Sequence, residues 1–381
     1  MGVKKCVPNL GIYNVIYLPL QYRPSILTMH RPGQRPIMPV TKRTELIRRF
    51  LLGAVKAGNQ HMIQDALDTF QVSRQAVHGH LAALVKLGNL EAHGNTRARY
   101  YALGPNRSHH QSFALKGLSE SDVYYRDFGF MFKDLSREVD DICHYGFTEM
   151  LNNAIDHSGG STVHVSVIRS TENIEILIED DGEGIFKHIA RKLKLVDPRE
   201  SILELSKGKL TTDPKRHTGQ GIFFTSRAFV DFAIQSDGLI FTHGDAEKFD
   251  MLSDADITEK STQVYMCIAT NSKKALKAVF DEYTGSEEED YAFNKTAVQL
   301  TLALSEGERL VSRSQAKRIL NRVDKFKTVM LDFKGVDAIG QAFADEIFRV
   351  YARHHPQISL VPINMEKDVE KMVVAATRYK D

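Results

Sequence analysis

The pattern of apolar and polar positions predicts three helices and a hairpin at the start of the chain. One helix face is marked by apolar residues at helical spacing, at Leu46, Ile47, Phe50, Leu51 and Ala54. A second helix is expected over 61–70, and a third follows Ser73, a residue type that favours the N-cap. Residues 90–93 and 97–103 alternate as two strands around Gly94-Asn95-Thr96.

The middle of the chain predicts a long helix followed by strands. The helix is expected over 135–154, and strands are expected over 163–168, 174–179 and 264–268. The stretch 186–216 is too long for a simple turn. It suits a mobile lid over phosphates, because its basic residues include Lys207, Lys209, Lys215 and Arg216.

The C-terminal part predicts a third module, in which strands alternate with helices. The strands are expected over 298–304, 328–333 and 358–361, and the helices over 312–323, 343–351 and 369–377. The solvated side of the first of these helices is expected to carry Lys317, Arg318 and Arg322. The acidic stretch 281–294 is predicted to be a flexible linker before this module.

Length and composition agree with a multidomain α+β protein, with domains over 41–107, 120–272 and 295–381. A chain of 381 residues is expected to form two or three domains, and a net charge of only +2 excludes a polycation. No apolar run reaches the roughly 18 residues of a membrane span, so no membrane partner is expected.

Two further features of the composition bear on the chain's start and its compartment. The three cysteines have no metal-site spacing, which fits a reducing cytoplasm and argues against a disulfide framework. Residues 1–40 hold six of the eleven prolines and no acidic residue, which predicts a disordered or non-native leader.

Two polar features in the middle of the chain carry candidate chemistry. Glu149 and Asn153 are four residues apart on the predicted helix, so a general base and an amide ligand for Mg²⁺ would share one face. Asp180 follows a strand and could accept a hydrogen bond from an adenine amino group. Gly182 and Gly184 would let backbone approach a flat ring. Taken separately, these features also fit a solvated polar pair and a tight turn.

A second glycine turn precedes another predicted helix, where free backbone N–H groups suit a phosphate. The turn consists of His217, Thr218, Gly219, Gln220, Gly221 and Ile222. Further along, Thr262 leads the strand at 264–268.

These segments, in this order over residues 135–270, resemble the GHKL ATPase superfamily: gyrase B subunits, histidine kinases, mismatch-repair ATPases and anti-sigma-factor kinases. The resemblance implies a Bergerat α/β sandwich that binds ATP and Mg²⁺. It implies that Glu149 is catalytic, Asn153 is the magnesium ligand and Asp180 binds adenine. Further contacts to the nucleotide would come from Gly182, Gly184, Gly219, Gly221 and Thr262, and from Asp156, His157 and Ile185 beside them.

The sequence departs from the histidine kinases in two ways. The second glycine turn, HTGQGIFF, is shorter than their form. His144 lies in the same predicted helix as Glu149, so no separate phosphotransfer helix pair can be built around it. A conventional sensor histidine kinase is therefore not expected.

Residues 41–107 resemble bacterial winged helix-turn-helix regulators, carried by VSRQAVHGHLAALVKLGNLEAHGNTRARYYAL. This segment has ten Lys and Arg against four Asp and Glu. The recognition helix would bring Ser73, Arg74, Gln75 and His78 to duplex DNA, and the wing would bring Arg97 and Arg99 to phosphates. The alternative is a winged helix that serves only protein contacts.

Residues 328–343 are similar to the central strand and helix start of STAS domains, the fold of anti-anti-sigma factors. Where phosphorylated STAS proteins have a serine, this chain has Gly340-Gln341-Ala342. Phosphorylation of its own tail at that place is therefore not supported. The resemblance implies a module for docking an unknown protein partner or for forming a homodimer.

The function expected from these features is an ATP-dependent regulatory switch with slow ATP hydrolysis and a DNA-binding head. One alternative is a protein serine/threonine kinase of the anti-sigma-factor type. Another is an ATP-dependent assembly or defence component that does not bind DNA.

Overall fold

The computed structural model describes residues 42–95, 98–210, 219–244, 249–255, 261–285, 292–304 and 308–378. The chain separates into two compact units, and each is described by itself. The first unit is Met1–His110 with Ser166–Ile174, and the second is Gln111–Val165 with Glu175–Asp381. Helices and several sheets are combined, as the predicted α+β class requires. The predicted leader, 1–40, lies outside the described residues.

The first unit contains three helices followed by a hairpin, as the sequence pattern predicts. The Ser73 hydroxyl caps the third helix by accepting a hydrogen bond from the Ala76 N–H at 3.2 Å. Buried residues from all three helices and the first strand share one core, which includes Leu51, Ala66 and Leu81. The elements are α2 (Lys42–Lys56), α3 (Met62–Phe70), α4 (Arg74–Lys86), β1 (Leu90–His93) and β2 (Tyr100–Leu103).

Two predicted details of this unit are wrong. Leu46 was expected on the buried face of α2, but it is 49% exposed because it lies at the edge of the apolar stripe. The second strand was expected from residue 97 but begins at Tyr100, because β1 and β2 pair only from His93↔Tyr100 to Leu90↔Leu103.

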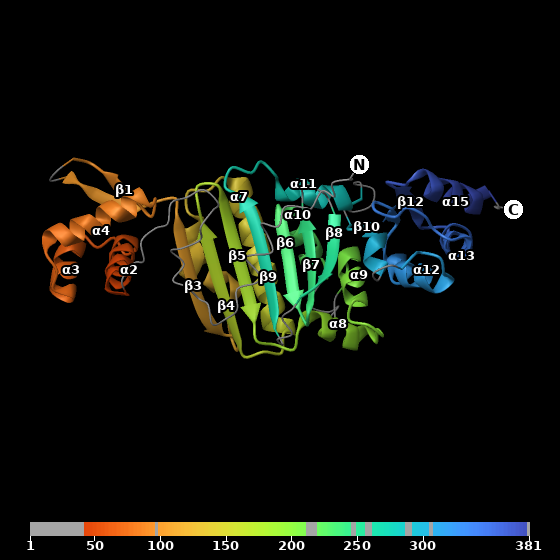
Figure 1. Ribbon diagram of the computed structural model, residues 1–381, viewed down its shortest axis with the longest axis horizontal. Helices are drawn as coiled ribbons and strands as arrows, with labels where there is room; N and C mark the ends of the chain where they lie inside the picture. The colour runs from red at the N-terminus through yellow and green to blue at the C-terminus, as the bar shows by residue number, and fades with distance from the viewer. Residues whose placement is uncertain are drawn as a thin grey trace, which may run out of the picture. The chain divides into compact units, whose positions relative to one another are not determined.

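The central part of the chain forms a seven-stranded sheet in the order β3-β4-β5-β9-β6-β7-β8. Figure 1 shows helices α7 and α10 on one face of this sheet. In β4 and β5, buried residues alternate strictly with partly exposed ones, so the two strands bury one face. The elements up to the second glycine turn are β3 (Arg107–Ala114), α5 (Glu120–Asp122), η2 (Val123–Phe128), α6 (Gly129–Phe132), α7 (Arg137–His157), β4 (Thr162–Arg169), β5 (Asn173–Asp180), α8 (Ile185–Leu193) and α9 (Glu200–Lys207).

After the second glycine turn comes α10 (Gly221–Ala228), followed by four antiparallel strands. The sequence prediction found only the last of these strands. A local signal for two others was present, because Asp237-Gly238 between apolar runs is a strong two-residue hairpin signal. The strands are β6 (Asp231–Ser236), β7 (Leu239–Gly244), β8 (Phe249–Asp254) and β9 (Thr262–Ala269).

The predicted mobile lid is wrong for the part of 186–216 that the structure describes. That stretch contains α8 and α9, and the α9 residues Ile202, Leu203 and Leu205 are buried. Lys207, expected over phosphates, is only 1% exposed. Buried apolar residues on α9 fix the helix by packing, which composition alone did not indicate.

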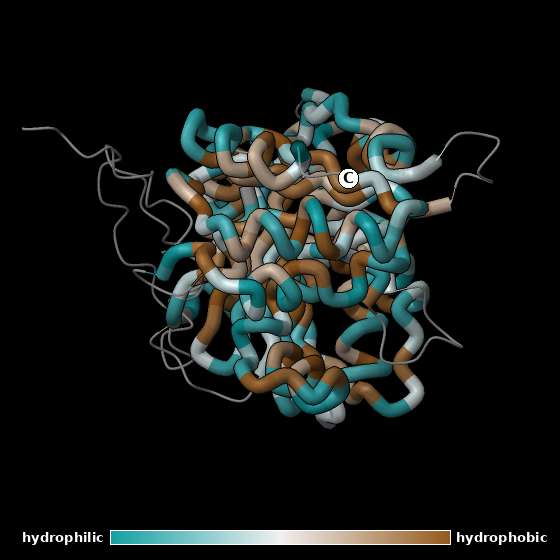
Figure 2. The backbone as a smooth tube through the Cα atoms, turned by 90° about the vertical axis from the view of Figure 1, so that its right-hand side faces the viewer, coloured by the Kyte–Doolittle hydropathy of each residue, from teal (hydrophilic) through white to brown (hydrophobic). Residues whose placement is uncertain are grey.

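The C-terminal domain has a parallel three-stranded sheet in the order β10-β11-β12. Along its helices, Figure 2 shows alternating apolar and polar segments, as expected of helices that bury one face. A capping box between Ser312 and Gln315 starts α12. The elements are β10 (Lys295–Gln299), η4 (Leu300–Ala303), α12 (Arg313–Leu320), η5 (Val323–Lys325), β11 (Thr328–Asp332), α13 (Gln341–Asp345), η6 (Glu346–Tyr351), α14 (Ala352–His354), β12 (Ser359–Ile363) and α15 (Lys367–Arg378).

Three expectations for this region are corrected by the structure. The first strand ends at Gln299 and gives way to a 3₁₀ turn. Arg318 and Arg322, expected in solvent, pair with Glu200 and Glu204 of the preceding domain, and Arg322 also donates to the Lys209 carbonyl. The predicted linker, 281–294, is packed at both described ends, since α11 (Leu276–Tyr283) buries Tyr283 and the residue before Asn294 is the buried Phe293.

Two absences follow from the described residues alone. None of the helices there combines the length and apolar content needed to cross a bilayer. Among the same residues, Cys143 and Cys267 are buried, and no disulfide joins them.

The packing of α7 on the end of α10 generates a prediction at Gly146. A Cβ at this position would lie 2.3 Å from the buried ring of Phe229 and 3.2 Å from the Met266 sulfur. Gly146→Ala is therefore expected to lower the free energy of unfolding by about 1–3 kcal/mol, measured by urea denaturation followed by circular dichroism. Gly129→Ala is the control, because a helical Cβ there meets nothing closer than 3.7 Å. Equal stability of the two variants would contradict the packing argument.

Candidate functional site

The candidate site is built around helix α7, which carries Glu149 beside the second glycine turn. The buried face of α7 includes Cys143, Phe147 and Met150, so the half-buried Glu149 is held on the side that faces α10. A Cβ on Gly221 would lie only 2.1 Å from Glu149 Oε2. The carboxylate therefore lies directly against the start of α10, and a Cβ at position 221 would displace it.

A second part of the site lies at the end of β5. Asp180 is 6% exposed and accepts a hydrogen bond from the Gly182 N–H at 2.9 Å and another from the backbone of Thr262. Burial raises the pKa of Asp180 to about 6, although both backbone hydrogen bonds act to lower it. This carboxyl group is thus poised between its neutral and charged forms near neutral pH.

Thr262 ties the start of β9 to the first glycine turn. Its hydroxyl accepts a hydrogen bond from the Ile185 N–H at 3.1 Å, across 77 positions of sequence. The structure thereby brings Asp180, Ile185 and Thr262 together, as the sequence predicted.

Packing within the protein accounts for both glycines of the first turn. A Cβ on Gly182 would meet the Ser158 carbonyl oxygen at 2.2 Å, and Glu183 donates to the same carbonyl at 3.0 Å. Gly184 has φ +90, and a Cβ there would meet the Asp237 carboxylate at 2.3 Å. Both glycines were expected to allow the approach of a flat ring, but close contacts with Ser158 and Asp237 already require them.

Asp237 is a member of this cluster that sequence reasoning missed. It lies in the β6–β7 turn, and its carboxylate accepts from the Lys187 backbone N–H at 3.2 Å and pairs with the Lys187 ammonium group at 2.7 Å. The Asp-Gly hairpin signal predicts an aspartate here but not its contact with α8. That contact fixes the first turn of α8 against the sheet.

The C-terminal end of α7 forms the more open side of the site. Asn153 and His157 are half-buried, and Asp156 is exposed. The ring centroids of His157 and His188 lie 6.4 Å apart, and His188 is hydrogen-bonded to Glu183. Asn153 therefore shares the polar face of α7 with Glu149, while Asp156 is directed to solvent.

The second glycine turn is described only in part. Gly219, Gln220, Gly221 and Ile222 are half-buried, and α10 begins at Gly221. His217, Thr218, Lys215 and Arg216 lie outside the described residues. The two lid lysines that are described bind elsewhere: Lys207 pairs with Glu204, and Lys209 donates to the carbonyl of Lys325.

The candidate DNA-contacting residues lie in the first unit. Arg74, Gln75 and His78 are exposed on α4, and Ser73 is the cap of that helix. Arg99 is exposed before β2, and Arg97 lies outside the described residues. The three exposed α4 side chains occupy neighbouring positions on one face, as the prediction required.

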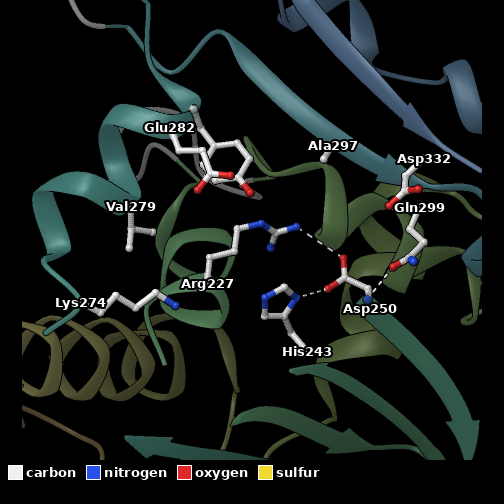
Figure 3. A pocket seen from close by; sticks show the side chains of 10 residues that line it. Arg227, His243, Asp250, Lys274, Val279, Glu282, Ala297, Gln299 and Asp332 are labelled. Atoms are coloured by element: carbon white, nitrogen blue, oxygen red, sulfur yellow. Dashed lines mark hydrogen bonds and ion pairs between the residues drawn. The ribbon is translucent and has the colours of Figure 1, made fainter. Parts of the chain in front are cut away.

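A separate polar cavity of about 130 Å³ lies where α10 and α11 meet β7, β8, β10 and β11, away from the residues predicted to bind nucleotide. In Figure 3, dashed lines join Asp250 to Arg227 and to His243, which pair with its carboxylate at 3.4 and 2.7 Å. Burial alone would raise the pKa of Asp250, but Arg227 and then His243 hold it below its usual value. No sequence signal points to this group, because its members are scattered along the chain and only the fold brings them together.

Comparison with known families concerns only the C-terminal domain. Residues 315–370 match a family described as the STAS-like domain of unknown function (DUF4325). The C-terminal domain is therefore STAS-like, and the match runs from α12 into α15. No curated protein matches the chain.

The raised pKa of Asp180 predicts a pH dependence of stability. The folded protein binds a proton on Asp180 below about pH 6, whereas an unfolded aspartate has a pKa near 3.9. The Asp180 contribution is therefore retained below about pH 4 and lost as the pH rises towards 6, by roughly 2–3 kcal/mol. In urea denaturation, Asp180→Asn is expected to gain stability relative to wild type between pH 4 and pH 7. The exposed Asp141→Asn is the control, and a pH-independent difference for Asp180→Asn would contradict this assignment.

Proposed function

We propose that the central domain is a GHKL-type domain that binds ATP with Mg²⁺, and that ATP occupancy sets the state of a regulatory switch. The observation that carries the proposal is that two pairs of segments, each far apart in the sequence, come into contact. Glu149 on α7 lies against Gly221 at the start of α10. Asp180 at the end of β5 accepts a hydrogen bond from the backbone of Thr262. A buried acid at one end and a carboxylate beside a helix start at the other suit the adenine and the phosphates of one nucleotide.

Each of these groups has a chemical part in the proposed site. Asp180 would accept a hydrogen bond from the adenine amino group, since a carboxylate has lone pairs beyond those used by two backbone N–H groups. The first N–H groups of α10 have no partners within that helix and would donate to phosphate oxygens. Glu149 would take a proton from an attacking water molecule as general base.

Magnesium fits the residues present as a partner of the nucleotide. Among the described residues, no group of three or more His, Cys, Asp and Glu side chains could hold a metal ion. Mg²⁺ characteristically takes one or two protein ligands and completes its shell with phosphate oxygens and water. Asn153, one helical turn beyond Glu149, would supply the amide oxygen. When bound, the ion would neutralise phosphate charge.

The first unit is proposed to be a winged helix that binds duplex DNA. The support is the exposure of Arg74, Gln75 and His78 on α4, the third of three helices, followed by the β1–β2 hairpin. We propose that ATP binding and slow hydrolysis shift the chain between two functional states.

The STAS-like domain is proposed to dock a protein partner. Gly340 is the N-cap of α13, and the next two residues are Gln341 and Ala342, so this helix start carries no hydroxyl to phosphorylate. A role that depends on phosphorylation at that place is therefore not proposed.

The proposed chemistry is tested with γ-labelled ATP and Mg²⁺, resolving free phosphate from phosphoprotein. Free phosphate is expected from the wild-type chain. Glu149→Ala should lower the rate by about 10²–10⁴-fold while ATP still binds, because it removes only the general base. Asp180→Asn should abolish ATP binding, because its amide group can turn a donor towards the adenine amino group.

The control for Glu149→Ala is Asp141→Ala, which removes an exposed carboxylate from the same helix. Full turnover in Glu149→Ala would contradict the assigned role. Label on protein in place of free phosphate would replace the hydrolase with the alternative protein kinase.

DNA binding is tested by fluorescence anisotropy with duplex DNA over a series of salt concentrations. The affinity should fall steeply with salt, and Arg99→Ala should reduce the slope of log K against log[salt] by about 1 if its side chain meets a phosphate. Arg49→Ala, an exposed arginine on α2 paired with Glu45, is the control. An affinity that does not depend on salt would favour the alternative of a module for protein contacts.

A further inference from the structure

Helix α9 and the residues that follow it connect the candidate nucleotide site with the STAS-like domain. Lys207, at the end of α9, is 1% exposed, and its ammonium group binds Glu204 Oε1 at 2.7 Å. The same group donates to the carbonyl oxygens of Arg318 and Asn321, at 3.3 and 2.9 Å. A buried lysine is thus satisfied partly by the last carbonyls of α12, where a helix favours a cation.

The partners of Glu204 also come from the STAS-like domain. Its second carboxylate oxygen pairs with Arg322 Nε at 3.4 Å, and its first accepts from the Asn321 amide at 3.3 Å. The Glu204 side chain is 3% exposed. Removing one partner from such a buried network leaves an uncompensated charge, so the network fixes the geometry between α9 and α12.

Backbone carbonyls at the end of α9 and just after it accept hydrogen bonds from the STAS-like domain. Lys207 O accepts from the Thr296 hydroxyl at 2.6 Å, and Lys209 O accepts from Arg322 Nη2 at 3.1 Å. In return, the Lys209 ammonium group donates to Lys325 O at 2.7 Å and lies 4.7 Å from the ring centroid of Phe326. The backbone at 207–209 therefore has fixed hydrogen-bond partners in the STAS-like domain.

This fixed backbone leads directly into the second glycine turn. The Leu210 N–H donates to the Gly219 carbonyl at 3.0 Å, so Gly219 is held by the residue that follows Lys209. Gly221, two residues further on, lies against Glu149. Arg322 is thus linked through Lys209, Leu210 and Gly219 to the place where the general base and the phosphates would meet.

Aromatic packing provides a second link. Phe223 and Phe224 in the first turn of α10 lie 4.9 and 4.8 Å from the ring of Phe293, just before β10. Phe293 in turn lies 5.3 Å from Phe326 of the STAS-like domain. The start of α10 therefore cannot shift without disturbing this domain's edge.

We infer that the STAS-like domain is part of the nucleotide site. Arg322 is a positioning residue for Gly219 and Gly221, which lie where the phosphates would bind. The inference rests on the proposed ATP binding. Nucleotide binding and the docking of α12 on α9 would stabilise each other. A partner that changes the docking of α12 would then change ATP affinity, and ATP would change the affinity for that partner by the same factor.

The test compares Arg322→Met with Arg322→Lys and with Arg313→Met, a control at an exposed arginine on α12. Hydrogen–deuterium exchange in the nucleotide-free chain reports the link itself. Exchange over residues 219–226 should quicken in Arg322→Met and stay at the wild-type rate in Arg313→Met. Arg322→Lys should be intermediate, because lysine keeps the charge for Glu204 but lacks the planar fork that also reaches Lys209 O.

ATP affinity, measured with a non-hydrolysable analogue, reports the consequence. Arg322→Met should weaken binding by at least about fivefold, the lower end of usual coupling between sites. Thr296→Val, which removes only the hydrogen bond to Lys207 O, is expected to act in the same direction and serves if Arg322→Met does not fold.

The outcomes separate the two proposals. Faster exchange at 219–226 with no analogue binding in the wild type would retain the link and overturn the nucleotide function. Analogue binding that is unchanged in Arg322→Met and Thr296→Val, with exchange at 219–226 also unchanged, would overturn the inference even if both variants melt at lower temperature.

Discussion

The close packing of α7 against α10 is the contact on which the candidate site depends. Two glycines make it: Gly146 lies under the ring of Phe229, and Gly221 leaves room for the Glu149 carboxylate. Helix α7 also covers one face of the central sheet. The buried face of α7 packs on the sheet, and its polar face is turned to the glycine turns. A side chain at Gly146 would press on the buried ring of Phe229, and one at Gly221 would displace the Glu149 carboxylate.

Two groups of buried charges lie where the central domain meets the STAS-like domain. One joins Glu204, Lys207 and Arg322, and the other joins Arg227, His243 and Asp250. Buried ion pairs add little net stability compared with apolar packing, but breaking one is costly. These pairs join α9 to the end of α12 and β8 to α10, and the loss of one partner would leave an uncompensated buried charge.

The contact between the two domains means that the STAS-like domain is not an independent module of this chain. As an independent docking module it would need only a linker, and the sequence analysis expected one at 281–294. The described ends of that stretch are instead packed, with Tyr283 and Phe293 inside an aromatic cluster that includes Phe223. A change at the edge of the STAS-like domain would therefore reach residues that pack on the start of α10.

Local patterns in the sequence determined most of the helices and several strands of the described chain. Ser73 and Ser312 cap the helices at whose starts they were expected, and β4 and β5 form where strands were expected at 163–168 and 174–179. Caps and periodicity depend only on near neighbours. The order of Glu149, Asp180, Gly221 and Thr262 was also enough to suggest a nucleotide site. The STAS-like likeness of the C-terminal domain was confirmed.

The tertiary structure alone decided which charges are buried and what they bind. Lys207 was expected in a lid, and Arg318 and Arg322 on a solvated helix face. Instead, Lys207 binds the STAS-like domain, and the two arginines bind the central domain. A charged side chain leaves water only when partners from distant segments compensate it, and sequence spacing carries no record of those partners. The same reason explains why Asp237 and the Arg227–Asp250–His243 group were missed, since their contacts exist only after the sheet and its helices have packed.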